Sequence, residues 1–183
     1  MYYMIKDNLD MYRNYILSDK DKMINNEMYY QAFDGKSHKV GYKPLNFVMA
    51  QASEKKRPIA DVWVTVVPVC SQKAKDIISS ICDEFEVEFL PCNLEGTNEQ
   101  YYVFNVLGAE DCVDYNNSKF LRYPSSEKIM FFEHIEFNKE IKKHFFRIND
   151  IKYSHYFVNE ETKEILEKAG LKGVFFDNSL FVK

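Results

Sequence analysis

"FEVEFLPCNLEGTNEQYYVFNVL", residues 85–107, contains two strand-like runs joined by a polar connection. In the first run Phe85, Val87 and Phe89 alternate with glutamates, which predicts a strand with one apolar and one charged face. In the second run only Asn105 interrupts the apolar residues, so we expect that strand to lie deeper in the sheet. The stretch therefore predicts two neighbouring strands of a sheet, with a polar surface connection between them.

Cys92 gives the same stretch a second interpretation, as part of a catalytic site. It follows Pro91 at the predicted end of a strand. Cys70 directly precedes a predicted helix, a position that lowers the pKa of a thiol and favours a nucleophile. No histidine of the chain lies in a recognisable catalytic signature, and a small buried apolar residue would serve equally well at both positions. A small cysteine-dependent enzyme using Cys70 or Cys92 is therefore the alternative hypothesis.

The residues upstream extend the predicted sheet and add a helix. Residues 61–69 are apolar at nearly every position and rich in β-branched side chains, which predicts one strand buried on both faces. Ser71 then offers a helix N-cap. Apolar residues follow it at helical spacing, namely Ala74, Ile77, Ile78 and Ile81. We expect this helix to pack on the sheet.

The C-terminal third repeats the plan of this segment. Asn159 is a second candidate N-cap, two glutamates follow in the first turn, and Gly170 stands where a helix would stop. "GVFF" is a predicted strand, which "DNS" can turn back into "LFV". "VCSQKAKDII" and "VNEETKEIL" thus share a cap–helix–strand plan, which is either a relic of duplication or the ordinary appearance of an amphipathic helix between strands.

The remaining strands complete a predicted fold class. "LNFVMA", "KFLRY", "KIMFFEHIEF" and "HFFRI" are further candidate strands, and "YYMI" near the N-terminus is another. Residues 1–44 otherwise lack a clean period and are expected to include an irregular extension, with a helical turn around 9–16. We predict an α+β fold: one domain over residues 1–183, built on a mixed, mostly antiparallel sheet with two or more helices packed on it.

Composition excludes several classes of function. The chain has 183 residues, of which 46% are hydrophobic, and its net charge of −4 argues against nucleic acid as the main partner. It shows neither a secretory signal nor an apolar run long enough to cross a bilayer, so we expect a cytoplasmic protein with no membrane partner. Its four cysteines contain no C-x-x-C pair and are expected to be free thiols.

No pattern in the sequence predicts a cofactor or a metal. There is no glycine loop of the kind that holds phosphates, and the histidines at 134, 144 and 155 match no spacing of metal ligands. Three acids, Glu110, Asp111 and Asp114, follow a predicted strand, where they are better explained as turn residues than as a general acid and base. We therefore predict no catalytic, cofactor-binding or metal-binding residues.

The order of these motifs resembles a known family. "SQKAKDII", "EFLP" and "YYVFNVLGAEDCVD" are followed near the C-terminus by "VNEETKEILEKAGLKGVFF". Together they resemble the bacterial immunity proteins found beside polymorphic and type VI secreted toxins, a family formerly described as a domain of unknown function. The resemblance runs from "DVWV" to the end of the chain, about two-thirds of its length. The matched residues are mostly apolar and cap residues, so they describe the scaffold.

The resemblance implies a cytoplasmic protein that binds and neutralises a cognate bacterial toxin by contact, without catalysis. It supplies no site residues, but loops and exposed faces are the usual place for partner contacts. We expect toxin-binding residues on the glutamate face and the 93–100 connection, together with one exposed tyrosine: Glu84, Glu86, Glu88, Asn93, Glu95, Asn98, Glu99 and Tyr115. The oligomeric state stays open.

Overall fold

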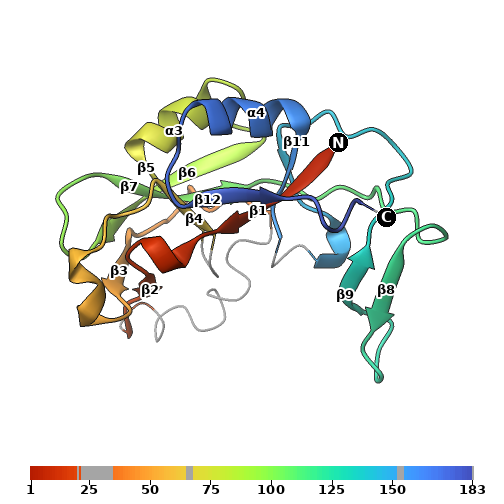
Figure 1. Cartoon of the computed structure of the whole chain (residues 1–183), viewed down its shortest axis with the longest axis horizontal. Helices are drawn as coiled ribbons and strands as arrows, with labels where there is room; N and C mark the ends of the chain where they lie inside the picture. Colours follow the sequence, from red (N-terminus) through yellow and green to blue (C-terminus); the bar gives the residue numbers. More distant parts are fainter. Residues whose placement is uncertain (20, 22–34, 65–67, 152–154, 183) are drawn as a thin grey trace.

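The computed structural model describes residues 1–19, 21, 35–64, 68–151 and 155–182, whose strands form three sheets (Figure 1). The first sheet has the strand order β10-β11-β1-β12, with all neighbours antiparallel. Its strands are β1 (Tyr2–Asp7), β10 (Phe145–Phe146), β11 (Phe157–Asn159) and β12 (Val174–Asp177). The N-terminal strand therefore lies between two strands from the C-terminal end of the chain.

The second sheet has six strands in the order β2-β3-β6-β7-β5-β4. They are β2 (Tyr15–Leu17), β3 (Leu45–Met49), β4 (Val62–Val64), β5 (Pro68–Ser71), β6 (Val87–Leu94) and β7 (Tyr101–Val106). The pair β3–β6 is parallel and the other neighbours are antiparallel, so the sheet is mixed. As the sequence predicted, β6 and β7 are neighbours, and β7 lies in the interior of the sheet.

The third sheet is an antiparallel hairpin, which we call the arm (residues 119–134). It consists of β8 (Lys119–Arg122) and β9 (Ile129–His134). The arm projects from the rest of the molecule (Figure 1). Within the described ranges, the connections contain the 3-10 helices η1 (Leu9–Met11), η2 (Ala52–Lys56) and η3 (Asn149–Ile151).

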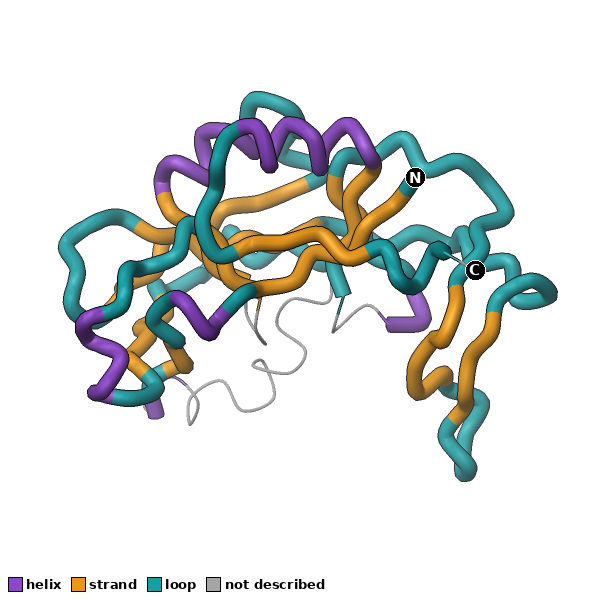
Figure 2. The backbone as a smooth tube through the Cα atoms, viewed as in Figure 1, coloured by secondary structure: helices purple, strands orange, loops and turns teal. Residues whose placement is uncertain are grey.

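Two α-helices, α3 (Gln72–Ser79) and α4 (Glu160–Lys168), cover the same side of the strands (Figure 2). Each begins at the predicted cap. Ser71 Oγ accepts a hydrogen bond from the Ala74 N–H, at 3.2 Å, and Asn159 Oδ1 accepts one from the Thr162 N–H, at 2.9 Å. Just after α4, Gly170 has φ +62°, the left-handed conformation that ends many helices.

The two helices occupy equivalent positions in the topology. Helix α3 connects β5 to β6, and both of these strands pair antiparallel with β7 between them. Helix α4 connects β11 to β12, and both of these strands pair antiparallel with β1. The two similar sequence segments thus lie in units with the same topology. In each unit a helix connects two parallel strands, and these strands flank a third strand.

Three groups of buried residues form the core. The group beneath the helices includes Ala74 and Ile78 of α3, Leu166 of α4, and residues of both large sheets. The second group contains Tyr15, Trp63 and Val103 and covers the other face of the six-stranded sheet, since adjacent strand residues point to opposite faces. The third contains Met4, Phe146 and Phe157 and joins the four-stranded sheet to the base of the arm.

The structure confirms the α+β class and corrects its details. The strands form three sheets and not one. Residues 61–69 were expected as one strand, but β4 and β5 pair antiparallel with Val62 opposite Cys70, so the chain reverses between them. Because most residues of both strands are buried, the sequence is apolar at nearly every position and gives no sign of the reversal. Pro68, which lacks a ladder donor, stands at the first position of β5, where a proline is tolerated.

The ends of the chain also differ from expectation. Residues 1–17 are not an irregular extension, because β1 occupies the middle of a sheet and β2 forms an edge strand. A single 3-10 turn, η1, replaces the expected helical turn at 9–16, and residues 20 and 22–34 lie outside the described part of the chain. The "LFV" segment forms a turn and not a strand, with Phe181 N–H donating to Asn178 O at 2.8 Å.

Candidate functional site

The three glutamates of the opening stretch do not share an exposed strand face. Asp83 Oδ1 accepts hydrogen bonds from the N–H groups of Phe85 (2.9 Å) and Glu86 (3.1 Å), so residues 84–86 form a turn before β6 begins. This turn also leaves Phe85 79% exposed, although the alternating pattern predicted its burial. The alternation therefore marks a strand that starts two residues later than predicted.

The three side chains have different environments. Glu84 is exposed and forms an ion pair with Lys39, at 3.3 Å. Glu86 accepts a hydrogen bond from the backbone N–H of Phe145 and so joins the two large sheets. Glu88 is only 1% exposed. Of the three, only Glu84 presents a largely exposed carboxylate to a partner.

Glu88 belongs to a buried polar network. Its carboxylate accepts hydrogen bonds from Ser37 Oγ (2.7 Å), the His38 N–H (2.8 Å) and Asn105 Nδ2 (2.8 Å). Asn105 Oδ1 in turn accepts a hydrogen bond from Arg147 Nη2, at 3.1 Å, and the Arg147 guanidinium lies over the ring of Tyr156. This network holds the segment around Ser37 against the sheet and accounts for the one polar residue in the β7 sequence.

Four predicted residues are exposed at the end of β6 and in the connection to β7: Asn93, in β6, and Glu95, Asn98 and Glu99, in the connection. Two of them are tied to β3, because Asn93 Nδ2 donates to Asn46 Oδ1 and the Met49 N–H donates to Glu95 Oε2, both at 2.9 Å. The connection lies at the opposite end of the molecule from the arm (Figure 1). The predicted residues therefore do not form one site.

Tyr115 lies at the base of the arm. Its ring meets the ring of Phe120 edge-on, with the centroids 6.0 Å apart. Its hydroxyl donates to the Asp150 carboxylate at 3.0 Å. Partial burial and the hydrogen bond to Asp150 raise the pKa of Tyr115 to about 12, so the hydroxyl is neutral at physiological pH. The ring is 44% exposed and available to a partner.

Exposed apolar side chains are concentrated on and beside the arm. Of the twelve large apolar side chains exposed among the described residues, five lie between positions 115 and 131: Tyr115, Leu121, Tyr123, Met130 and Phe131. Single exposed apolar residues are ordinary on protein surfaces, but a group of them marks an interaction site. The arm is therefore the strongest candidate for such a site.

Strand pairing separates the two faces of the arm. Phe120 lies opposite Phe132, with ring centroids 5.7 Å apart, and Phe132 packs into the core at the base of the arm. Leu121 lies opposite Phe131, so this pair points to the other face, towards solvent. We call Leu121, Tyr123, Met130 and Phe131 the outer face of the arm.

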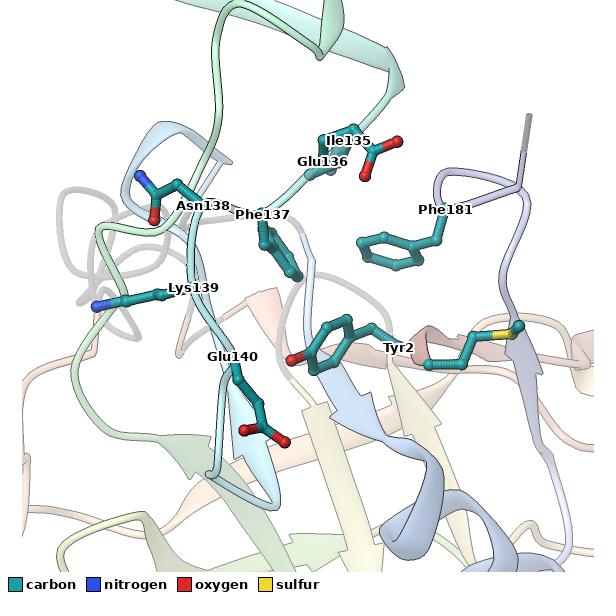
Figure 3. Close-up of a pocket in the computed structure, with 9 residues that line it drawn as sticks. Tyr2, Ile135, Glu136, Phe137, Asn138, Lys139, Glu140 and Phe181 are labelled. Atoms are coloured by element: carbon teal, nitrogen blue, oxygen red, sulfur yellow. The ribbon is translucent and has the colours of Figure 1, made fainter.

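A pocket of about 450 Å³ opens at the base of the arm, just after the end of β9 (Figure 3). The rings of Tyr2, Phe137 and Phe181 turn towards one another in it, and Lys139 and Glu140 stand at its side. Tyr2 and Phe137 are 5.0 Å apart between centroids, edge to face. The Ile135 N–H donates to Leu180 O at 2.7 Å, which ties this end of β9 to the C-terminal segment. The arm thus rises beside an aromatic pocket with a polar rim.

The cysteines of the alternative hypothesis are buried. Cys70 is 0% exposed and Cys92 is 2% exposed. Burial raises the pKa of the Cys70 thiol well above its usual range and that of Cys92 to about 12. Although Cys70 precedes α3 by two residues, burial outweighs any help from the helix dipole. Both thiols are therefore protonated at physiological pH.

Sequence reasoning found the strands of the arm but not its outer face. Two β-bulges, between Lys119 and Phe120 and between Leu121 and Arg122 in the register, break the alternation of β9 against β8. Met130 and Phe131 are consecutive exposed apolar residues for this reason. A usable signal was present in the predicted strand "KFLRY", where Leu121 and Tyr123 are two residues apart and so share one face.

Comparison with known proteins identifies the family of the chain. No curated protein matches the chain. The model of the Immunity protein family (Imm11) matches residues 2–179, nearly the whole chain and more than the two-thirds for which a resemblance was recognised. None of the helices within the described ranges is long and apolar enough to cross a membrane. Because the family model covers residues 2–179, the chain belongs to the Immunity protein family (Imm11).

Proposed function

We propose that this protein binds a cognate bacterial toxin in the cytoplasm and neutralises it by contact, without catalysing a reaction. Membership of an immunity family supports a protective role. The grouping of exposed apolar side chains on and beside the arm carries the proposal that this role is exercised by docking. Aromatic and long apolar side chains within a polar rim supply most of the affinity of protein–protein interfaces.

The end of β6 and the β6–β7 connection form a second proposed contact region. Asn93, Glu95, Asn98 and Glu99 are exposed there, and Glu84 is exposed in the turn before β6. Glu88 is no longer among the proposed contacts, because its carboxylate is buried. Glu86 is a weaker candidate, since it already accepts a hydrogen bond from the Phe145 backbone.

The cysteine-dependent enzyme is less well supported by the geometry. A nucleophilic cysteine is partly exposed and has a lowered pKa, whereas burial raises the pKa of both Cys70 and Cys92.

We also propose that residues 1–183 form a single domain.

Titration of toxin activity tests the proposal. The probe is the toxic domain of the cognate toxin, which is sought in the reading frame next to the gene for this chain and assayed in purified form and by growth rescue on coexpression. A neutralising partner removes its activity in proportion to the amount added and does so fully near an equimolar ratio. Progressive inactivation of a large excess of toxin over time would show catalysis instead. Absence of both binding and growth rescue would refute the proposed function.

A further inference from the structure

We propose that the arm enters a concave cleft of the toxin whose walls are apolar and whose rim carries carboxylates. This inference rests on the proposed function and names the surface and the chemistry of the partner. It combines three observations: the shape of the arm, the side chains of its outer face, and the local sign of its charge.

The shape of the arm suits a cleft. Its longer strand, β9, has six residues and spans roughly 20 Å at the usual rise of a strand. Two paired strands are narrow, because their axes lie only about 5 Å apart. The arm stands clear of the rest of the molecule (Figure 1). A narrow projection of this kind buries most surface when it enters a concavity, and ligand clefts of enzymes are concave and mostly apolar.

The side chains of the outer face suit apolar walls. Leu121 and Phe131 form a cross-strand pair and are 49% and 44% exposed, respectively. Tyr123 and Met130 extend this apolar surface along the hairpin, at 48% and 41% exposure. The opposite face is already used, since Phe120 and Phe132 pack together and against the core. The arm is thus supported from one side and presents the other to a partner.

The charge of the arm opposes that of the chain. The arm, residues 119–134, contains three basic side chains, Lys119, Arg122 and Lys128, and two acids, Glu127 and Glu133. Its net charge is therefore +1, in a chain with net charge −4. Arg122 is partly neutralised by Glu127, at 3.7 Å. Neither Lys119 nor Lys128 forms an ion pair with a residue that the structure describes. Lys119 is exposed at the start of β8, two residues before Leu121, so a partner with carboxylates around an apolar surface complements it.

Matched variants of the full-length chain test the apolar contribution. Leu121→Ser and Phe131→Ser remove the outer pair. Phe175→Ser is the control, because Phe175 is 45% exposed on β12, outside the arm. With the toxic domain as probe, we expect each arm variant to raise the Kd about tenfold or more and the control to change it less than about twofold. Circular dichroism and thermal unfolding establish that the variants are folded.

Charge variants and cross-linking test the chemistry of the partner. Lys119→Glu with Lys128→Glu should slow association and reduce its dependence on salt, whereas Lys55→Glu with Lys56→Glu, in η2, should do so much less. A zero-length carbodiimide reagent joins lysines to carboxylates in contact. We expect it to join Lys119 or Lys128 to aspartates or glutamates of the toxic domain.

The outcomes separate this inference from the proposed function. If the unmodified chain fails to bind the toxic domain, the proposed function fails. If it binds and the arm variants bind equally well, or if cross-links form only from Lys55 or Lys56, the arm inference alone is wrong. It is also wrong if the arm variants leave toxin binding intact but abolish a self-association seen by sedimentation. A further outcome is that the arm variants keep their affinity for the toxic domain and lose binding only to vesicles of equal parts phosphatidylcholine and phosphatidylglycerol. That result would show that the arm binds membranes, and it would also overturn the arm inference.

Discussion

Glu88 and Asn105 face each other across the β6–β7 ladder, and Asn105 Nδ2 donates a hydrogen bond to Glu88 Oε1 at 2.8 Å. The adjacent pairs of this ladder are apolar, and Glu88 also accepts hydrogen bonds from the backbone N–H of His38 and the hydroxyl of Ser37, in a distant segment. A buried carboxylate with three donors fixes one arrangement of these segments, because any other arrangement leaves polar groups unpaired.

Replacing Glu88 should therefore be costly. Glu88→Ala leaves the three donors without their acceptor, and we expect a loss of about 3 kcal/mol in the free energy of unfolding measured in urea. Glu84→Ala is the control, since its ion pair with Lys39 is exposed and should change stability by less than about 0.5 kcal/mol. Equal effects of the two substitutions would contradict the assigned network.

Alanine substitutions at two glycines distinguish the cost of backbone strain from the cost of a steric clash. Both have positive φ, +88° at Gly173 and +62° at Gly170. A Cβ at Gly173 would lie 2.4 Å from Ala60 Cβ and 2.7 Å from Val62 O, whereas nothing lies within 4 Å at Gly170. We expect Gly170→Ala to cost about 1 kcal/mol from the backbone alone and Gly173→Ala about 3 kcal/mol or more. Thermal unfolding of the two variants checks the order, and the reverse order would show that Gly173 does not lie against Ala60 and Val62.

Thiol labelling tests the interpretation of the cysteines. In the native protein at pH 8, iodoacetamide should modify Cys82 first, because Cys70, Cys92 and Cys112 are at most 2% exposed. All four should react at similar rates in urea. Faster labelling of native Cys70 or Cys92 than of a free cysteine peptide would revive the enzyme hypothesis.

Glu110 predicts a dependence of stability on pH. Hydrogen bonds from Lys143 (3.0 Å) and Lys139 (3.2 Å) hold the pKa of its carboxyl below the usual value. A lowered pKa in the folded state stabilises the protein above the unfolded pKa, about 4.3, and this contribution disappears as the pH falls through the folded pKa.

Glu110→Gln should accordingly lower the free energy of unfolding by about 0.5–1 kcal/mol at pH 7, because the side chain is partly exposed. The difference from the unmodified protein should shrink below about pH 4. Glu127→Gln, at a carboxylate that is 98% exposed, should leave stability unchanged across this range. A difference that persists undiminished at low pH would argue against the assigned ion pairs.

The cap signals in the sequence were reliable, whereas features that depend on distant residues were not predicted. Ser71 and Asn159 were identified as caps because a cap depends only on the next three residues. The reversal between β4 and β5 was missed, since two buried strands joined end to end resemble one. The role of Glu88 was also hidden, because its partner His38 lies fifty positions away in the sequence.

The candidate site shows the same division. The predicted strands around Leu121 and Phe131 are present, but a face becomes visible only once the register is known, and the bulges of β9 shift that register. The exposed β6–β7 connection was predicted correctly as surface because its residues are polar and contain a turn glycine, Gly96. That it lies far from Tyr115 depends on the tertiary fold and has no local signal.

The place of β1 between β11 and β12 sets the order in which the protein can be completed during translation. The strand at Tyr2–Asp7 leaves the ribosome before the other strands of its sheet, yet both of its neighbours are made much later, from residues 157–159 and 174–177. Pairings so distant in the sequence slow folding, because a long loop must close before they form. A nascent chain that stops before residue 157 has neither neighbour for β1. If the proposed function holds, a cell is shielded only by copies whose synthesis has passed β12, so protection lags behind the start of translation.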